Sequence, residues 1–258
     1  MVKTIVFASV EALASVDDEK AKAAIARLAE KGMPVILFGD GARAEVEPIR
    51  ERLKITAPFI VEDGSAIFTP VERSPFEAPL GEQDGNYYVY ELGCPYVQAR
   101  AGLRVLANAI SHPLKGFGDF TVQQLERSLK VSEEEAHQAK AREFSEPFMT
   151  PKSVDLDELR QSAREMGFDA VIRDAEESRF SLLRGAEASL TAAAKLVIAA
   201  YGKKATQEDA LWVRGMTTRQ AEMDALSKAK GTSNWTGVLL SMQPGATDTW
   251  LDAVDRCL

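Results

Sequence analysis

Carboxylates are the side chains in this sequence on which active-site chemistry would have to rely. The 258 residues contain two histidines, His112 and His137, and two cysteines, Cys94 and Cys257. So few histidines nearly exclude Ser-His-Asp catalysis and His-based metal sites, and the cysteines lack the spacing of a metal or disulfide motif. Hydrolytic chemistry would therefore depend on Asp and Glu side chains.

A few polar positions follow apolar stretches that resemble strands. Ser9 and Glu11 follow the first stretch, and Asp40 lies between two glycines after the second. Ser9 could act as a nucleophile, although a small polar residue that closes a strand is the commoner case. Glu11 and Glu222 could hold a cation, although carboxylates at helix starts are usually solvated and favour the helix dipole. Asp40 is most simply a turn residue.

Composition and charge narrow the class of protein. The 31 basic and 39 acidic residues give a formal charge of −8, which disfavours binding to nucleic acid or anionic lipid. The first thirteen residues are apolar but too short to span a bilayer, and acidic residues follow them, so we expect neither a membrane helix nor a signal peptide. Two cysteines without a disulfide framework favour a cytoplasmic protein.

The elements that must position these residues alternate between strand and helix at both ends of the chain. Hydrophobic periodicity predicts strands at Thr4 to Val10, Met33 to Phe38, Ala210 to Val213 and Gly237 to Met242, with helices at Glu19 to Lys31, Arg43 to Leu53, Ser189 to Tyr201, Arg219 to Ala229 and Thr247 to Val254. Asp63-Gly64 predicts a hairpin turn between two short strands. Parallel strands joined by helices predict a doubly wound core with ligands at the carboxyl ends of the strands.

The middle of the chain does not continue the regular alternation of strand and helix. It combines helices with strands near Tyr87 to Leu92, Glu143 to Met149, Ala170 to Arg173 and Arg179 to Leu183. Helices over an antiparallel sheet are the expected result. We therefore predict an α/β core at 1–82 and 183–258, with an inserted α+β domain at 83–182.

Several long strings carry a resemblance to a known family: Arg43 to Pro48, Phe59 to Phe68, Tyr88 to Gly93, Gly116 to Asp119 and Ala139 to Phe148. With these strings the chain resembles the haloacid dehalogenase (HAD) superfamily and, more narrowly, the mannosyl-3-phosphoglycerate phosphatases with a large inserted cap. The resemblance implies a HAD-like Rossmannoid core with a parallel sheet, and an α+β cap inserted into it.

The first catalytic motif of that family departs from its usual form here. The resemblance implies an Asp nucleophile and an Asp acid/base after the first strand, and these positions hold Ser9 and Glu11. A covalent acyl-phosphate cannot form on a serine.

The other three motifs also differ from the family pattern. Gly39 stands where a hydroxyl would meet the phosphate, and Leu190 stands where a lysine would neutralise it. The Mg²⁺-binding motif falls near Thr218, where Glu222 is the acidic residue and Arg219 adds an opposing charge. We therefore expect no catalytic residue, no metal site and no cofactor, with Glu11 and Glu222 as the weak metal candidates.

The cap of the resembling family grips the sugar and glycerate parts of its substrate. By that resemblance we expect binding of a small sugar acid or sugar phosphate, or else of a partner protein. The candidate ligand-binding residues are Asp40, Arg43, Gly116, Asp119, Lys140, Arg142 and Ser145. The alternative is an active Mg²⁺-dependent sugar-phosphate phosphatase with an unorthodox site. In a purely structural interpretation of the same segment, the phenylalanines pack in the core of the cap and its charged residues lie on the surface.

Overall fold

The structure is a computed structural model that describes residues 2–14, 16–173, 178–203, 211–240 and 246–257. The chain divides into two compact units. The first comprises Met1–Asp40, Val46–Tyr90 and Ser189–Leu258, and the second comprises Gly41–Glu45 and Glu91–Ala188.

The first unit is built on an eight-stranded sheet with the order β11-β10-β1-β2-β3-β4-β6-β5. Its strands are β1 (Thr4–Ser9), β2 (Val35–Phe38), β3 (Phe59–Val61), β4 (Ala66–Pro70), β5 (Glu82–Asp84), β6 (Tyr87–Glu91), β10 (Trp212–Thr217) and β11 (Asn234–Leu239). The strands from β11 to β3 run parallel, while β4 is antiparallel to β3 and β5 is antiparallel to β6.

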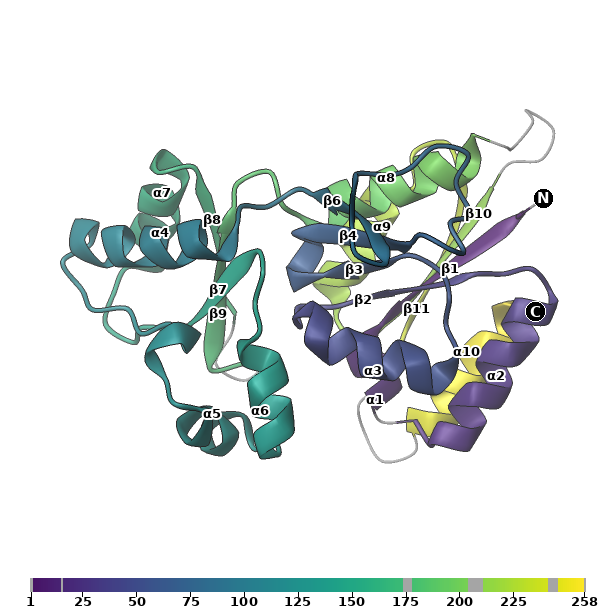
Figure 1. Cartoon of the computed structure of the whole chain (residues 1–258), viewed down its shortest axis with the longest axis horizontal. Helices are drawn as coiled ribbons and strands as arrows, with labels where there is room; N and C mark the ends of the chain where they lie inside the picture. The colour runs from purple at the N-terminus through teal and green to yellow at the C-terminus, as the bar shows by residue number, and fades with distance from the viewer. Residues whose placement is uncertain (1, 15, 174–177, 204–210, 241–245, 258) are drawn as a thin grey trace. The chain divides into compact units, whose positions relative to one another are not determined.

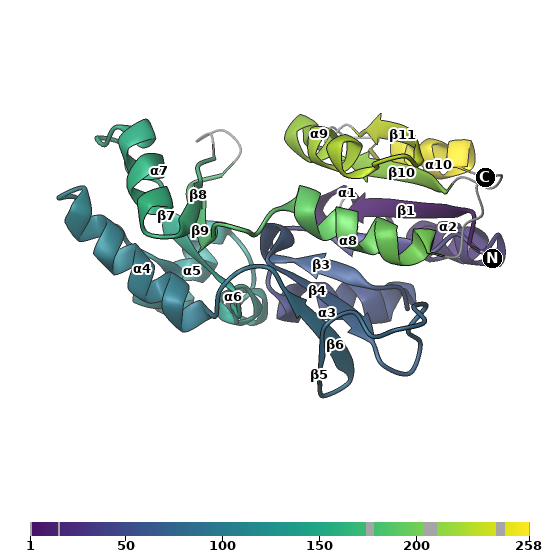
Figure 2. The ribbon, with the colours of Figure 1, turned by 90° about the horizontal axis from the view of Figure 1, so that it is seen from above.

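Helices cover both faces of this sheet. They are α1 (Val10–Ala14), α2 (Asp18–Glu30), α3 (Arg43–Leu53), α8 (Leu190–Gly202), α9 (Gln220–Ala229) and α10 (Ala246–Cys257). Figure 1 shows α8 and α9 on one face and α2, α3 and α10 on the other, and Figure 2 shows the sheet from above. Because both faces are covered, the central strands are continuous apolar runs, and Ile5, Phe7 and Ile36 are fully buried.

The predicted hairpin at Asp63-Gly64 is present between β3 and β4, through the 3₁₀ turn η1 (Glu62–Gly64). All three turn residues have positive φ angles, which are 50° at Glu62, 57° at Asp63 and 89° at Gly64. A Cβ on Gly64 would lie 2.2 Å from the carbonyl carbon of Ser189 at the start of α8. Glycine is therefore required there both by the left-handed backbone and by the close approach of α8.

The hairpin of β5 and β6 belongs to the large sheet, whereas the predicted inserted domain begins at residue 83. The ring of Tyr87 packs edge-on against Phe59 and Phe68, with centroids 5.6 and 5.7 Å apart. Strand β5 forms one margin of the sheet and is exposed along its whole length.

The second unit is α+β, with the three-stranded antiparallel sheet β7-β9-β8. Its elements are α4 (Tyr96–Ala109), η2 (Phe117–Asp119), α5 (Val122–Leu129), α6 (Glu133–Lys140), β7 (Ser145–Met149), α7 (Leu156–Glu165), β8 (Phe168–Val171) and β9 (Phe180–Gly185). One apolar cluster joins α4 and α7 to the sheet through Leu103, Leu159 and Phe148, and a second surrounds Phe117 and Phe180. The predicted fold class, a mostly parallel α/β core with a smaller α+β unit, is confirmed.

Two predicted strand positions are shifted in the structure. The strand predicted at 210–213 is β10 at Trp212–Thr217, and the strand predicted at 237–242 is β11 at Asn234–Leu239. Residues 210, 241 and 242 lie outside the described residues. The later end of β10 places Thr217, rather than Val213, at the carboxyl edge of the sheet.

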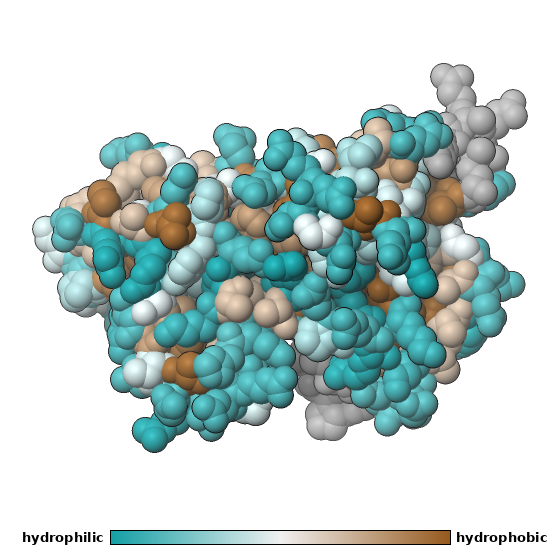
Figure 3. Space-filling model, viewed as in Figure 1, coloured by the Kyte–Doolittle hydropathy of each residue, from teal (hydrophilic) through white to brown (hydrophobic). Residues whose placement is uncertain are grey.

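The face of the molecule in Figure 3 is mostly hydrophilic, with hydrophobic residues in small separate areas. Among the described residues, we find no helix with the length and apolar character needed to cross a bilayer.

Candidate functional site

The carboxyl ends of three parallel strands meet at one edge of the large sheet. Ser9 at the end of β1 pairs in register with Phe38 at the end of β2, and Ala8 pairs with Met216 near the end of β10. The segments that follow these strands carry Glu11, Asp40 and Arg219. Strand order therefore brings together charged residues that are far apart in the sequence.

The guanidinium of Arg219 lies at the centre of this edge. Its Nη2 donates to Glu11 Oε1 at 3.1 Å and to Glu222 Oε1. The Thr217 hydroxyl donates to Glu222 Oε2 and accepts a hydrogen bond from the Arg219 amide at 3.1 Å. Both carboxylates are thus held by groups of the chain itself.

Burial and charge act in opposite directions on these groups. Burial lowers the pKa of Arg219, but the charges of Glu11, Glu222 and Asp40 outweigh it, and the net effect is a raised pKa. Burial raises the pKa of Glu222, against the influence of Arg219 and of the Thr217 hydroxyl. Arg219 is therefore a permanent cation among carboxylates.

The residues at the four family motif positions are buried or half-buried, or form hydrogen bonds within the chain. Ser9 is fully buried, and its Oγ accepts a hydrogen bond from the Ala12 amide at 3.2 Å. The carbonyl oxygen of Gly39 accepts from the Asp63 amide at 2.9 Å. Leu190 is the first residue of α8 and is buried, while Thr218 is half-buried in the turn before α9.

A Mg²⁺ ion, which the resemblance implies for this edge, does not fit the side chains present. Mg²⁺ requires near-octahedral oxygen coordination, and two of its possible ligands, Glu11 and Glu222, already bind Arg219. Nor do the residues described include a group of three or more His, Cys, Asp or Glu side chains arranged to hold a metal ion.

The second unit contains a separate polar cluster around Arg100 and Glu146. Arg100 donates to Asp119 Oδ1 at 2.9 Å and to Glu146 Oε1 at 3.2 Å, and Glu146 also accepts from the Gly118 amide at 3.0 Å. Asp119 accepts from the Gly116 amide at 3.0 Å. A Cβ on Gly116 would lie 2.1 Å from Glu146 Oε1, so this glycine makes room for the buried carboxylate.

Burial is the main influence on the two groups that pack beside Arg100. It raises the pKa of Glu146, while the Gly118 amide, the Tyr96 hydroxyl and Arg100 act in the other direction. Burial, followed by the charge of Glu146, raises the pKa of Tyr96 to about 12.

The ligand candidates Arg43, Lys140, Arg142 and Ser145 lie in the second unit, and the three charged ones contact other residues of that unit. Lys140 Nζ donates to the Phe120 carbonyl oxygen, and Ser145 is buried on β7. Arg142 lies 3.8 Å from a Glu45 carboxylate oxygen, and Arg43 donates to Glu143 at 2.9 Å. Gly116 and Asp119 thus share one cluster, while Lys140, Arg142 and Arg43 have other partners.

Sequence reasoning did not select Thr217, Arg100 or Glu146 as site residues, and it treated Arg219 only as an opposing charge. The spacing of Arg219 and Glu222, three residues apart at the start of a helix, is a local signal of their ion pair. Arg100 and Glu146 are 46 residues apart, and no local pattern connects them.

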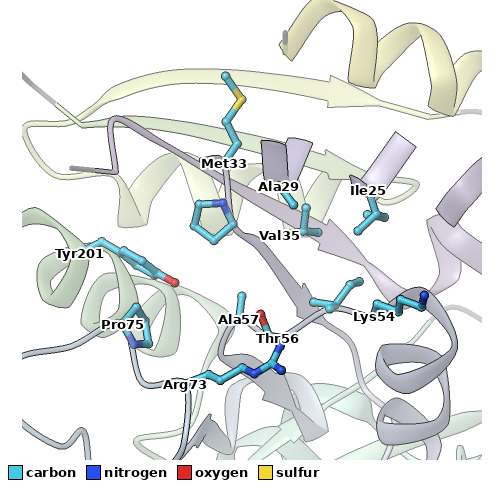
Figure 4. Close-up of a pocket in the computed structure, with 12 residues that line it drawn as sticks. Ile25, Ala29, Met33, Val35, Lys54, Thr56, Ala57, Arg73, Pro75 and Tyr201 are labelled. Atoms are coloured by element: carbon cyan, nitrogen blue, oxygen red, sulfur yellow. The ribbon is translucent and has the colours of Figure 1, made fainter. Parts of the chain in front are cut away.

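A small cavity of about 150 Å³ lies elsewhere in the first unit. Figure 4 shows its lining, which includes Met33, Val35 and Tyr201. Met33 precedes β2 and Val35 begins it, so the cavity lies at the amino end of that strand rather than at the edge with Arg219. Its lining is largely apolar, and we do not consider it the candidate site.

Comparison with solved structures identifies the architecture. A haloacid dehalogenase-like hydrolase from B. subtilis matches 98% of this chain and 99% of its own, with a TM-score of 0.58 and 11% sequence identity. A sugar phosphatase of HAD subclass IIB matches 98% and 95%, with a TM-score of 0.56 and 12% identity. The chain has the HAD fold. The sucrose-phosphatase of Synechocystis, solved with sucrose and phosphate, gives a TM-score of 0.54 at 9% identity over 98% of this chain and 88% of its own.

Sequence similarity points to a narrower group. A glucosyl-3-phosphoglycerate/mannosyl-3-phosphoglycerate phosphatase from Persephonella marina is 33% identical over 142 residues, which are 55% of this chain and 52% of that protein. The mannosyl-3-phosphoglycerate phosphatase of Pyrococcus furiosus is 38% identical over 130 residues, which are 50% and 52%. The matches thus span about half the length of these curated relatives. No family model matches the chain. The resemblance predicted from the sequence is confirmed.

Proposed function

We propose that this HAD-fold protein binds a sugar acid or sugar phosphate and does not hydrolyse phosphate esters by the Asp-nucleophile, Mg²⁺-dependent route. The observation that carries the proposal is the Arg219 guanidinium, which binds both Glu11 and Glu222 at the carboxyl edge of the sheet. A fixed cation of the chain there competes with a divalent metal ion for the same carboxylates.

The chemistry of the neighbouring positions supports the same proposal. The Ser9 hydroxyl is buried and accepts a hydrogen bond from the Ala12 amide, and the carboxylate of Glu11, the candidate base two residues later, is engaged by Arg219. Leu190 offers no charge to a phosphate. Single electrostatic groups of this kind are worth about two to four decades of rate, although their effects are not additive.

The second unit supports the binding part of the proposal. Arg100, Asp119 and Glu146 form a hydrogen-bonded group of donors and acceptors held by the backbone of Gly116 and Gly118. About a quarter of the Arg100 side chain and more than a third of the Asp119 side chain remain exposed. Such groups suit sugar hydroxyls and carboxylates. We also propose a cytoplasmic location, because the sequence has two cysteines and no spacing typical of a disulfide framework.

An active Mg²⁺-dependent phosphatase is the second candidate. The observation in its favour is the 32–38% identity to proteins named as mannosyl-3-phosphoglycerate phosphatases.

A phosphate-release assay separates the two candidates. The whole chain is incubated with Mg²⁺ and mannosyl-3-phosphoglycerate, and the proposal predicts turnover well below about one per second. Faster turnover would establish the second candidate. The Ser9→Asp, Glu11→Asp double variant should remain inactive as well, because Leu190 and Arg219 are unchanged in it.

Ligand binding is tested by thermal shift with mannosylglycerate, the dephosphorylated compound. We expect stabilisation of the parent chain, its loss in Arg142→Ala and in the milder Arg100→Lys, and its retention in the exposed control Arg104→Ala. No shift with any anionic sugar would favour a partner protein as the ligand.

A further inference from the structure

The second unit contains a basic cavity that the proposed function does not use. Its volume is about 770 Å³, and it is lined by the segment after α4, the end of β7, the start of α7 and the strand ends on either side of residues 174–177. Met149 pairs with Phe180 at this end of the small sheet, and Ser145 pairs with Arg184 at the other. The cavity is thus a different site from the cluster of Arg100 and Glu146.

Positive charge is concentrated in this cavity. Five of its thirteen lining residues are Lys or Arg, against 31 of 258 in the whole chain, and none of the thirteen is Asp or Glu. The five are Lys115, Lys152, Arg160, Arg173 and Arg179. Asp174, Glu176 and Glu177 follow Arg173 in the sequence and lie outside the described residues. In a chain of net charge −8, such a concentration of cations among the described residues favours the binding of an anion.

The lining cations differ in how far the chain itself satisfies them. Arg160 pairs with Asp157 at 2.8 Å, and Lys115 Nζ lies 3.9 Å from the centre of the Phe120 ring. Lys152 and Arg179 are exposed and form no ion pair within the described part of the chain. These two side chains come from different segments, and a ligand with two anionic groups can meet each of them with a group of its own.

Size and lining chemistry restrict the ligand further. A volume of about 770 Å³ is in the range of small-molecule sites. The thirteen lining residues include no Phe, Tyr or Trp on which a base could stack, whereas Leu156 and Ile172 offer aliphatic surface. We propose that this cavity binds a small organic polyanion, with at least two phosphate or carboxylate groups on a sugar-like or aliphatic body.

Calorimetric titration of the whole chain with fructose 1,6-bisphosphate tests the proposal. We expect binding that weakens about tenfold when ionic strength rises from about 0.05 to 0.5 M, because exposed cations are screened by salt. The Lys152→Ala, Arg179→Ala double variant should bind about tenfold more weakly or worse. The matched control Arg104→Ala, an exposed cation on α4, should bind within about twofold of the parent.

Citrate, titrated in parallel, distinguishes the two sources of the anionic groups. Binding of either probe that is lost in the double variant supports the proposal, and the tighter probe shows whether phosphate or carboxylate is preferred. Absence of binding of both probes overturns it. So does binding that persists in the double variant or falls equally in Arg104→Ala.

Discussion

Replacing Arg219 by Gln removes the positive charge that pairs with Glu11 and Glu222 at the carboxyl edge of the large sheet. Glu222, whose side chain is 8% exposed, then loses the positive charge of Arg219, and Glu11, 34% exposed, loses its ion pair with Arg219. Breaking a buried pair in this way costs about 3–5 kcal/mol. Because the Arg219 side chain is itself 21% exposed, solvent screening reduces the expected loss to about 2–3 kcal/mol.

The measurement is urea unfolding followed by tryptophan fluorescence. Trp212, Trp235 and Trp250 are the three tryptophans of the chain, and all belong to the first unit, so their emission reports on the unit that contains Arg219. A thermal scan should show a melting temperature lower by about 4–12 °C for a protein of this size.

The loss should depend on pH in a defined direction. Burial raises the pKa of Glu222 above its ordinary value of 4.5, and removal of Arg219 raises it further. Protonation of Glu222 relieves the unpaired charge, so the deficit of the variant is small at acidic pH and grows as pH rises through the raised pKa. Urea unfolding of the parent and the variant near pH 5 and near pH 8 measures the small and the large deficit.

Lys195→Gln is the matched control, because it removes one positive charge from an exposed position in the same unit. It should change stability by less than about 0.5 kcal/mol. If Arg219→Gln is no less stable than Lys195→Gln near pH 8, or if its deficit is the same near pH 5, then Arg219 does not neutralise this edge.

Three further results are expected. Adding Mg²⁺ should raise the melting temperature of Arg219→Gln but not of the parent, because the guanidinium no longer competes with a divalent cation for Glu11 and Glu222. Equal shifts in the two proteins would show that the guanidinium does not compete with the metal ion. Gly64→Ala should lower the free energy of unfolding by about 2–5 kcal/mol, because the added Cβ meets the start of α8. The control Gly32→Ala, which also has positive φ but has open space around it, should lower it by about 1 kcal/mol. Similar losses in the two variants would refute the close approach of α8 to Gly64. Glu146→Gln should flatten the change in unfolding free energy between about pH 4 and 7, because the raised pKa of Glu146 makes the parent lose stability as pH rises through it; an unchanged pH profile would contradict this.

Local sequence patterns were sufficient to predict the α/β core, because its strands are buried on both faces and read as unbroken apolar runs. The same patterns were not sufficient to predict which side chains meet at the candidate site. Glu11 and Arg219 are 208 residues apart, and they meet only because β1 and β10 are neighbours in the sheet. Strand order is a long-range property that neither segment encodes alone.

The membership of β5 and β6 in the large sheet is a long-range property of the same kind. Tyr87 begins a strand after a segment rich in proline, glycine and acid, so its neighbours in sequence suggested a linker into a new domain. The packing of Tyr87 against Phe59 and Phe68, which lie 28 and 19 residues earlier, helps to hold β6 in the large sheet. That contact joins residues far apart in the sequence, so no local pattern reports it.

The short strand β5 has a consequence for how the folded chain avoids association with other copies. It leaves unpaired backbone groups at one border of the sheet, where a foreign strand could otherwise add. Two of its three residues, Glu82 and Asp84, are acidic and exposed. An incoming copy would bring the same negative charges to the same place, so electrostatic repulsion disfavours pairing between two such borders at neutral pH.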